Sequence, residues 1–277
     1  MYQKTVGLRV FRIVGVTVVL LWTVFPVLFL FMSAFKSPRE IFSFPPRLFF
    51  RPTFQNFIDL PAEAPTFYSA LGTSAIVAIL ASVLTIVLAV PAGYALSRYR
   101  RKFLQGSAFF MLLVRMYPPI VLTVPLFPVF SALGLIDNIL VLVVLYSAMF
   151  ISLCTWLMKT YMDEVPIEIE ESAAIDGANT WQKITRIVLP LSVHGIVATA
   201  IFVSIFSWKE FTFAYIFTGS NTQTAPIVLD MMLTPVTTVS WGPLFAASAM
   251  QLLPILIFVW LIQSYLIGGL RTGGVKQ

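Results

Sequence analysis

Three ionisable residues stand inside long apolar stretches of the sequence. Arg115, Lys209 and Glu210 each interrupt a run of hydrophobic side chains, and the aromatic Trp208 directly precedes Lys209. A charge at the centre of a bilayer costs about 2.5–3.5 kcal/mol on insertion scales, so such a residue usually faces a cavity or a partner. If these stretches cross a membrane, the four residues are candidates for a translocation pathway. A structural ion pair or a subunit contact is the alternative.

Neighbouring residues of a helix point about 100° apart, so Lys209 and Glu210 cannot both face one narrow feature. We expect one of them to address the pathway and the other to pair elsewhere. Metal and nucleophile chemistry find little support, because His194 is the only histidine and Cys154 the only cysteine. The sequence also contains no G-x-S-x-G elbow and no G-x-x-x-x-G-K-[ST] phosphate loop. We therefore predict a protein that is not an enzyme, with no catalytic residue, no metal ligand and no cofactor of its own.

A second group of charges lies together in the stretch EIEESAAIDGANTWQKITRIVLPL, Glu168 to Leu191. Pro166 ends the helix before it, because the residue preceding a proline is pushed out of the helical region. Gly177 supplies the positive φ of a helix-stopping turn, and Asn179-Thr180 can cap a second helix that Pro190 ends. The pattern predicts a short helix, a glycine turn and another short helix, with one small, apolar face and an acidic rim.

Two surfaces suit such an insert. An amphipathic hairpin resting on lipid headgroups is one, but interfacial helices are usually basic, and this one is acidic toward its start. A protein partner fits better, because the small residues Ser172 and Ala173 allow close approach.

The composition places the chain in a membrane. It is 58% hydrophobic and 11% charged, whereas soluble domains carry about 25% charged residues. Six segments have the roughly 20 mainly apolar residues that a spanning helix needs. They cover about 12–34, 70–96, 107–131, 138–158, 195–217 and 244–267. We predict an all-α integral membrane protein with six transmembrane helices and one transmembrane domain over residues 1–277.

Four prolines stand in the third predicted span: Pro118, Pro119, Pro125 and Pro128. They favour a broken helix bordering a pathway, although ordinary membrane-helix packing is an alternative.

The basic residues fix the orientation. With both termini inside, twelve lysines and arginines fall on the cytoplasmic side and four on the other. The four are Lys36, Arg39, Arg47 and Arg51. The positive-inside rule therefore predicts cytoplasmic termini and a cytoplasmic loop over about 159–194, between the fourth and fifth helices, that contains the polar insert.

Glu171–Ala178 (ESAAIDGA), followed by Ile184–Pro190 (ITRIVLP), resembles the cytoplasmic signature of binding-protein-dependent ATP-binding-cassette import permeases, and most closely the carbohydrate importers of the maltose-permease type. The usual form is E-A-A-x-x-D-G-A, then I-x-LP; this sequence departs from the family at Ser172, His194 and Lys209. The likeness continues through Arg115–Ile120, Pro125–Phe127, Leu133–Leu135, Asp137–Asn138, Trp208–Ala214, Trp241–Ala247 and Gly269–Lys276.

The resemblance implies a coupling helix that docks into a groove of a cytoplasmic ATPase subunit. Its residues would be Glu171, Ala173, Ala174, Asp176, Gly177 and Ala178. The alanines would permit close approach, Gly177 would make the turn, and the carboxylates would offer hydrogen bonds or caps. ATP-driven closure of the ATPases would then move this helix and reorient the membrane helices.

The function expected from this resemblance is the transmembrane subunit of an ATP-driven importer of a sugar or sugar derivative in the cytoplasmic (inner) membrane of a bacterium. Its partners would be a second, homologous permease subunit in a heterodimer, two ATP-binding subunits holding ATP and Mg²⁺, an extracytoplasmic solute-binding protein and membrane lipid, and no nucleic acid. Homodimer or heterodimer, the particular sugar, and whether this subunit or its partner contacts it stay open. An ion-coupled carrier or channel without an ATPase is the alternative function.

Overall fold

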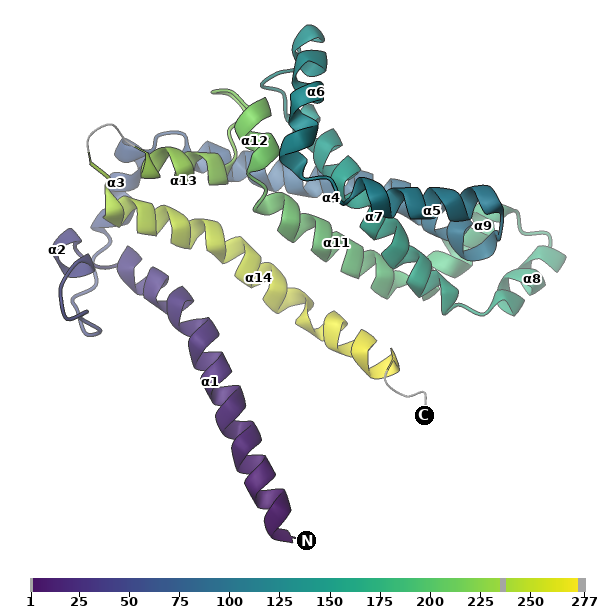
Figure 1. Cartoon of the computed structure of the whole chain (residues 1–277), viewed down its shortest axis with the longest axis horizontal. Coiled ribbons are helices and arrows are strands. Elements are labelled where there is room, and N and C mark those ends of the chain that lie inside the picture. Colours follow the sequence, from purple (N-terminus) through teal and green to yellow (C-terminus); the bar gives the residue numbers. More distant parts are fainter. Residues whose placement is uncertain (1, 235–237, 274–277) are drawn as a thin grey trace. The chain divides into compact units, whose positions relative to one another are not determined.

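The computed structural model describes residues 2–234 and 238–273, and all the regular elements in these ranges are helices (Figure 1). This confirms the all-α fold. Lys276, which the orientation argument counts, lies outside the described residues. The helices are α1 (Tyr2–Ala34), α2 (Pro38–Ile41), α3 (Gln55–Glu63), α4 (Phe67–Arg98), α5 (Lys102–Val114), α6 (Pro119–Ala132), α7 (Ile139–Asp163), α8 (Ile167–Ile175), α9 (Thr180–Lys183), the π-helical turn η1 (Ile184–Val188), α10 (Leu189–Leu191), α11 (Val193–Trp208), α12 (Thr212–Phe217), α13 (Ala225–Leu233) and α14 (Trp241–Gly273).

Four helices in the described ranges are long and apolar enough to cross a membrane: residues 8–34 of α1, all of α4, all of α7, and residues 241–261 of α14. Two bent pairs raise the number of candidate spans to six if each pair counts as one. The chain bends by 98° between α5 and α6, at the Pro118–Pro119 pair where the sequence predicts a break. The second pair bends by 78° between Leu191 and Val193.

The chain divides into two compact units, one formed by Met1–Phe67 with Leu229–Pro254 and the other by Tyr68–Val228 with Ile255–Gln277. In the second unit, α7 is the central helix and lies beside α11 (Figure 1). Glycines allow two close approaches to it: a Cβ on Gly93 of α4 would lie 2.8 Å from the Cβ of Met158, and one on Gly195 of α11 would lie 2.8 Å from the Tyr161 ring. Small residues at helix interfaces are how membrane helices pack without a hydrophobic driving force.

The predicted span 195–217 is not one continuous helix. Helix α11 ends at Trp208, and α12 begins at Thr212. The physical reason is Glu210, whose carboxylate accepts hydrogen bonds from the backbone N–H of Phe213 at 3.1 Å and of Ala214 at 3.3 Å. A side-chain acceptor there satisfies donors that the first turn of a helix leaves unpaired. A new helix therefore starts at this point.

Asp137 ties two loops of the second unit together. Its carboxylate accepts hydrogen bonds from the backbone of Gly219 at 2.8 Å and of Thr222 at 3.0 Å. The hydroxyl of Thr222 donates at 2.6 Å and the side-chain amide of Asn221 at 2.7 Å. Partial burial raises the pKa of Asp137, but these hydrogen bonds to the charged form outweigh it and hold the pKa at about 2. The connection between α6 and α7 is thereby joined to the one between α12 and α13.

In the first unit, α1 ends against α3 and the start of α14. The side-chain amide of the buried Asn56 donates to the backbone oxygens of Ala34 and Lys36, both at 2.8 Å. Lys36 is itself buried, with its ammonium 5.0 Å from the centroid of the Phe29 ring, within the range of a cation–π interaction. A Cβ on Gly242 would come within 2.2 Å of the Asn56 side-chain oxygen. Glycine is therefore required where α14 crosses α3.

Gly242→Ala is expected to lower the free energy of unfolding by about 1–3 kcal/mol, the usual cost of forcing an extra methyl into a packed site. The thermal unfolding midpoint in detergent measures it. The control is Gly72→Ala in α4, where nothing lies within 4 Å of the added Cβ and the helix gains about 1 kcal/mol at most. Equal midpoints for Gly242→Ala and the parent would contradict the packing argument.

Asp137→Asn is expected to lower the same midpoint, because an amide replaces the charged acceptor of these bonds. The folded pKa is about 2, below the ordinary 3.8. The stabilisation is therefore present above about pH 4 and lost as the pH falls toward 2. Midpoints across this range should converge for the parent and Asp137→Asn. Asp59→Asn, which removes one charged acceptor of a bond from Gln55, is the control with a smaller effect. A gap that persists at low pH would refute this account.

Candidate functional site

The predicted polar insert folds as α8, a glycine turn, and α9 continued by η1 and α10. Gly177 has φ +88°. Its N–H donates to the oxygen of Ala174 at 3.1 Å, and the N–H of Ala178 donates to the oxygen of Ala173 at 2.9 Å. These two bonds form a Schellman motif, which satisfies the free carbonyls at the end of α8. Local sequence therefore suffices to stop this helix.

The start of α9 is equally well defined. The Asn179 side chain accepts from the N–H of Gln182 at 2.9 Å, and the Gln182 side chain accepts from the N–H of Asn179 at 2.8 Å. This capping box pairs two of the donors that a helix start leaves free. Further along, Ile184 and Val188 are buried in the core of the second unit. One side of the second short helix is thereby fixed to the membrane helices.

The residues predicted to couple to an ATPase lie mostly at the surface. Glu171, Ala174, Asp176 and Gly177 are exposed, whereas Ala173 and Ala178 are half-buried. Two large apolar side chains are exposed next to them: Ile175 is 88% and Trp181 70% exposed. We call Glu171, Ala174, Ile175 and Trp181 the α8 outer surface. It combines an apolar centre with a carboxylate, which suits contact with another protein.

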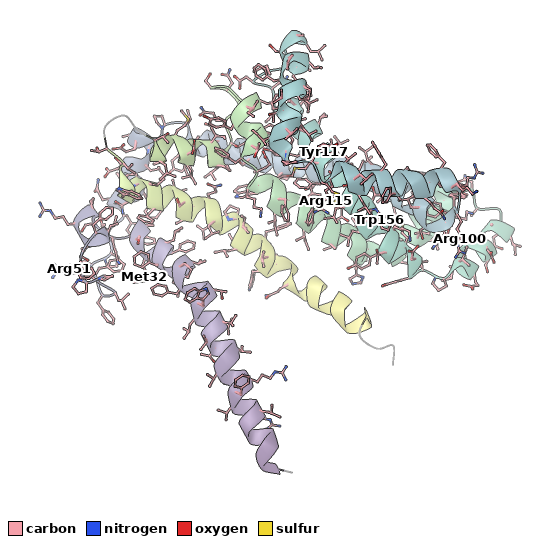
Figure 2. All side chains as sticks on the ribbon, in the orientation of Figure 1. Met32, Arg51, Arg100, Arg115, Tyr117 and Trp156 are labelled. Atoms are coloured by element: carbon pink, nitrogen blue, oxygen red, sulfur yellow. The ribbon has the colours of Figure 1, made fainter. Side chains whose placement is uncertain are left out.

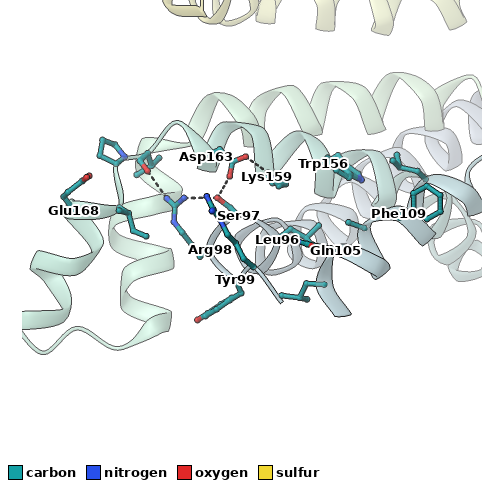
Figure 3. Close-up of a pocket in the computed structure, with 17 residues that line it drawn as sticks. Leu96, Ser97, Arg98, Tyr99, Gln105, Phe109, Trp156, Lys159, Asp163 and Glu168 are labelled. Carbon is teal, nitrogen blue, oxygen red and sulfur yellow. Dashed lines mark hydrogen bonds and ion pairs between the residues drawn. The ribbon is translucent and has the colours of Figure 1, made fainter. Parts of the chain in front are cut away.

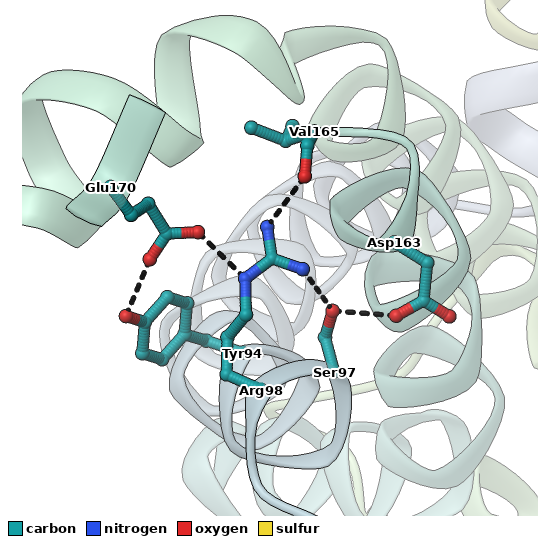
Figure 4. A network of polar contacts seen from close by, with 6 residues as sticks. All are labelled: Tyr94, Ser97, Arg98, Asp163, Val165 and Glu170. Atoms are coloured by element: carbon teal, nitrogen blue, oxygen red, sulfur yellow. Dashed lines mark hydrogen bonds and ion pairs between the residues drawn. The ribbon is translucent and has the colours of Figure 1, made fainter. Parts of the chain in front are cut away.

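Glu170 points the other way and is 4% exposed. Its carboxylate accepts from the hydroxyl of Tyr94 at 2.7 Å and from Nε of Arg98 at 2.6 Å (Figure 4). The guanidinium of Arg98 also donates to the backbone oxygen of Val165 at 3.0 Å and to the Ser97 hydroxyl at 2.8 Å. Beside this network lies a cavity of about 960 Å³, lined by Ser97, Arg98, Trp156, Lys159, Asp163 and Glu168 among others (Figure 3).

Sequence reasoning missed Glu170 as a separate group, because it counted this residue among the carboxylates of the acidic rim. The available signal is its spacing of three residues from Ala173, which places both on one face of α8. That signal does not identify Arg98 as the partner, since Arg98 is 72 residues away in the chain.

The four pathway candidates do not lie together: Arg115 and Lys209 are exposed, whereas Glu210 is buried and Trp208 is half-buried. Arg115 is exposed at the junction of α5 and α6, where Figure 2 also labels Tyr117. It lines a cavity of about 500 Å³ with Phe206. The ammonium of Lys209 lies 4.2 Å from the centroid of the Phe206 ring, and Phe206 itself lines the cavity that Arg115 lines. Glu210 is buried and turned toward the start of α12, and Trp208 is half-buried.

The described ranges contain no group of three or more His, Cys, Asp or Glu side chains arranged to hold an ion. The structure has apolar helices long enough to cross a membrane, the exposed α8 outer surface, and a cavity lined by Arg115.

Comparison with known proteins gives the family. Residues 86–271 match the binding-protein-dependent transport system inner membrane component family. The permease protein of an arabinooligosaccharides transport system of Halalkalibacterium halodurans is 32% identical over 270 residues, which are 95% of each chain. The trehalose/maltose transport system permease protein of Thermococcus litoralis is 29% identical over 271 residues, which are 97% of each chain.

A solved bacterial ABC transporter involved in the import of the acidic polysaccharide alginate contains a chain of similar fold. The TM-score is 0.78 at 19% identity, covering 93% of this chain and 96% of that one. At this identity the similarity concerns the fold alone. The sequence matches show that this chain belongs to the family of binding-protein-dependent transport system inner membrane components and is a permease subunit of an ATP-binding-cassette importer, in which separate subunits hydrolyse ATP.

Proposed function

We propose that this permease subunit translocates a sugar or sugar derivative, and that α8 is the coupling helix on which an ATPase subunit acts. The observation that carries the proposal is the α8 outer surface. An isoleucine and a tryptophan as exposed as Ile175 and Trp181, with the exposed carboxylate of Glu171 one turn before Ile175 on α8, form an anchor pattern typical of a protein interface. The Schellman turn at Gly177 holds this surface in a fixed shape.

The sugar class rests on relatives whose names state trehalose, maltose and arabinooligosaccharides.

The proposed assembly contains a second, homologous permease, two ATPase subunits that bind ATP and Mg²⁺, and a solute-binding protein on the opposite face. Arg115 and Lys209 are proposed to lie near the pathway, because Arg115 lines the 500 Å³ cavity and Lys209 lies over the ring of Phe206, which lines it too. Both termini are proposed to be cytoplasmic, in keeping with the distribution of lysine and arginine.

Glu171→Lys combined with Ile175→Asp is expected to reduce recovery of the ATPase subunits at least about tenfold when the chain is purified in mild detergent from its native membrane. An interface hot spot is worth about 2 kcal/mol or more, and 1.4 kcal/mol corresponds to tenfold. The matched control is Glu63→Lys, which reverses an exposed carboxylate on α3. Recovery of the ATPases at the parent level from the double variant would remove α8 from the docking role.

The purified complex, reconstituted into vesicles with its solute-binding protein, is expected to take up a sugar only when ATP is supplied. The test panel is trehalose, maltose, an arabino-oligosaccharide and a uronic-acid oligosaccharide, with methionine as the control solute. Uptake of methionine alone would contradict the sugar class. Cation flux through the isolated chain without ATP would instead favour an ion-coupled carrier or channel.

A further inference from the structure

A buried carboxylate, Glu170, joins helix α8 to α4. In the backbone packing, α8 contacts mainly α9 and η1. Both oxygens of Glu170 are engaged by donors on α4, one by Tyr94 and the other by Arg98. The side chains of Arg98 and Glu170 are only 10% and 4% exposed. A residue enclosed in this way has no free oxygen to offer a partner protein.

Arg98 also holds the connection that leads into α8. Its guanidinium donates to the oxygen of Val165, in the three-residue link between α7 and α8. That bond holds a link that consists of only Glu164, Val165 and Pro166. Arg98 therefore connects three segments of the chain: the end of α4, where it lies, the link after α7, and the middle of α8.

The interaction is stiff for an electrostatic reason. Effective dielectric screening inside a protein is much weaker than in water, so a buried pair loses far more than an exposed pair when it separates. A force that displaces α8 then moves Arg98 with it instead of opening the contact. Arg98 is the last residue of α4, a helix of 32 residues that is a candidate membrane span. Displacement at that end is carried along the helix.

We propose that the cluster of Tyr94, Arg98 and Glu170 is the mechanical link through which displacement of α8 reaches α4, with Glu170 as its positioning residue. The inference rests on the proposed coupling role of α8. It assigns different roles to two neighbouring residues of α8: Glu171 faces the ATPase subunit, and Glu170 transfers the displacement of α8 to the membrane helix α4. Breaking the link uncouples the two without releasing the ATPase.

The test uses the complex purified from its native membrane and a cysteine reporter just past α4. Arg100→Cys places the reporter on an exposed position of the loop between α4 and α5, labelled in Figure 2. The native Cys154 is buried and is therefore expected to react slowly. The rate of labelling of this chain by a charged maleimide is measured without nucleotide and after trapping with Mg²⁺, ADP and vanadate.

The ratio of the labelling rates of the reporter chain with and without trapping is expected to differ clearly from one, because movement of the end of α4 changes the exposure of the reporter. Adding Glu170→Gln is expected to bring that ratio close to one, with the amount of ATPase subunit recovered per folded permease chain unchanged. Tyr94→Phe, which keeps the ion pair, should reduce the ratio less. Glu168→Gln, an exposed carboxylate two residues earlier on α8, should leave it unchanged.

A second variant distinguishes loss of the nucleotide response at the reporter from loss of folded protein. Glu170→Gln leaves the charge of Arg98 buried without its partner, which lowers the yield of folded protein. Arg98→Gln with Glu170→Gln removes both charges, so the yield should recover while the nucleotide response stays lost. If the response returns with the yield, the cluster has only a structural role and the proposal is overturned.

Two further results would also overturn it. One is a reporter chain whose labelling does not change on trapping, since the end of α4 would then not follow the ATPases. The other is a full response in Glu170→Gln. Failure of the coupling role of α8 would look different, because it appears as ATPase subunits that stay bound to Glu171→Lys with Ile175→Asp. ATPase recovery therefore tests the coupling role of α8, and the labelling ratio tests the link through Glu170.

Discussion

A buried charge must be matched in place, and in this protein that constraint governs how the polar insert is joined to the membrane helices. Glu170 would be costly beneath α8 without Tyr94 and Arg98, and Arg98 would be costly at the end of α4 without Glu170. Each residue therefore fixes where the other can be. The orientation of α8 follows from the pair, and with it the direction in which Glu171 and Ile175 are exposed.

The same requirement, applied to backbone groups, explains other interruptions of the helical pattern. Glu210 accepts from two N–H groups at the start of α12, and Asp137 accepts from the backbone of the loop between α12 and α13. At Glu210 these donors are buried, so the carboxylate takes the place that water would have. A charge within an apolar segment is thus not by itself a sign of a transport pathway. Glu210 is the clearest case, because its environment accounts for it structurally.

The pathway candidates differ in this respect. Arg115 is exposed beside a cavity, and Lys209 lies over an aromatic ring at that cavity's edge. Neither cation has the backbone-pairing role that Glu210 has with α12. The bend at Pro118–Pro119 opens the helix next to Arg115, since proline removes a backbone donor and prevents a continuous ladder.

Sequence by itself determined the features that depend on near neighbours in the chain. Hydropathy gave the helical class, Pro118 gave the break, and Gly177 and Asn179 gave the turn and the cap of the polar insert, because each effect acts within a few residues. The motif from Glu171 to Ala178 predicted the importer family. Only the tertiary structure decided that Glu170 faces Arg98, that Glu210 caps α12 and that Lys209 lies over Phe206. Helical periodicity limits which residues share a face, but the partner on another helix depends on how the helices pack.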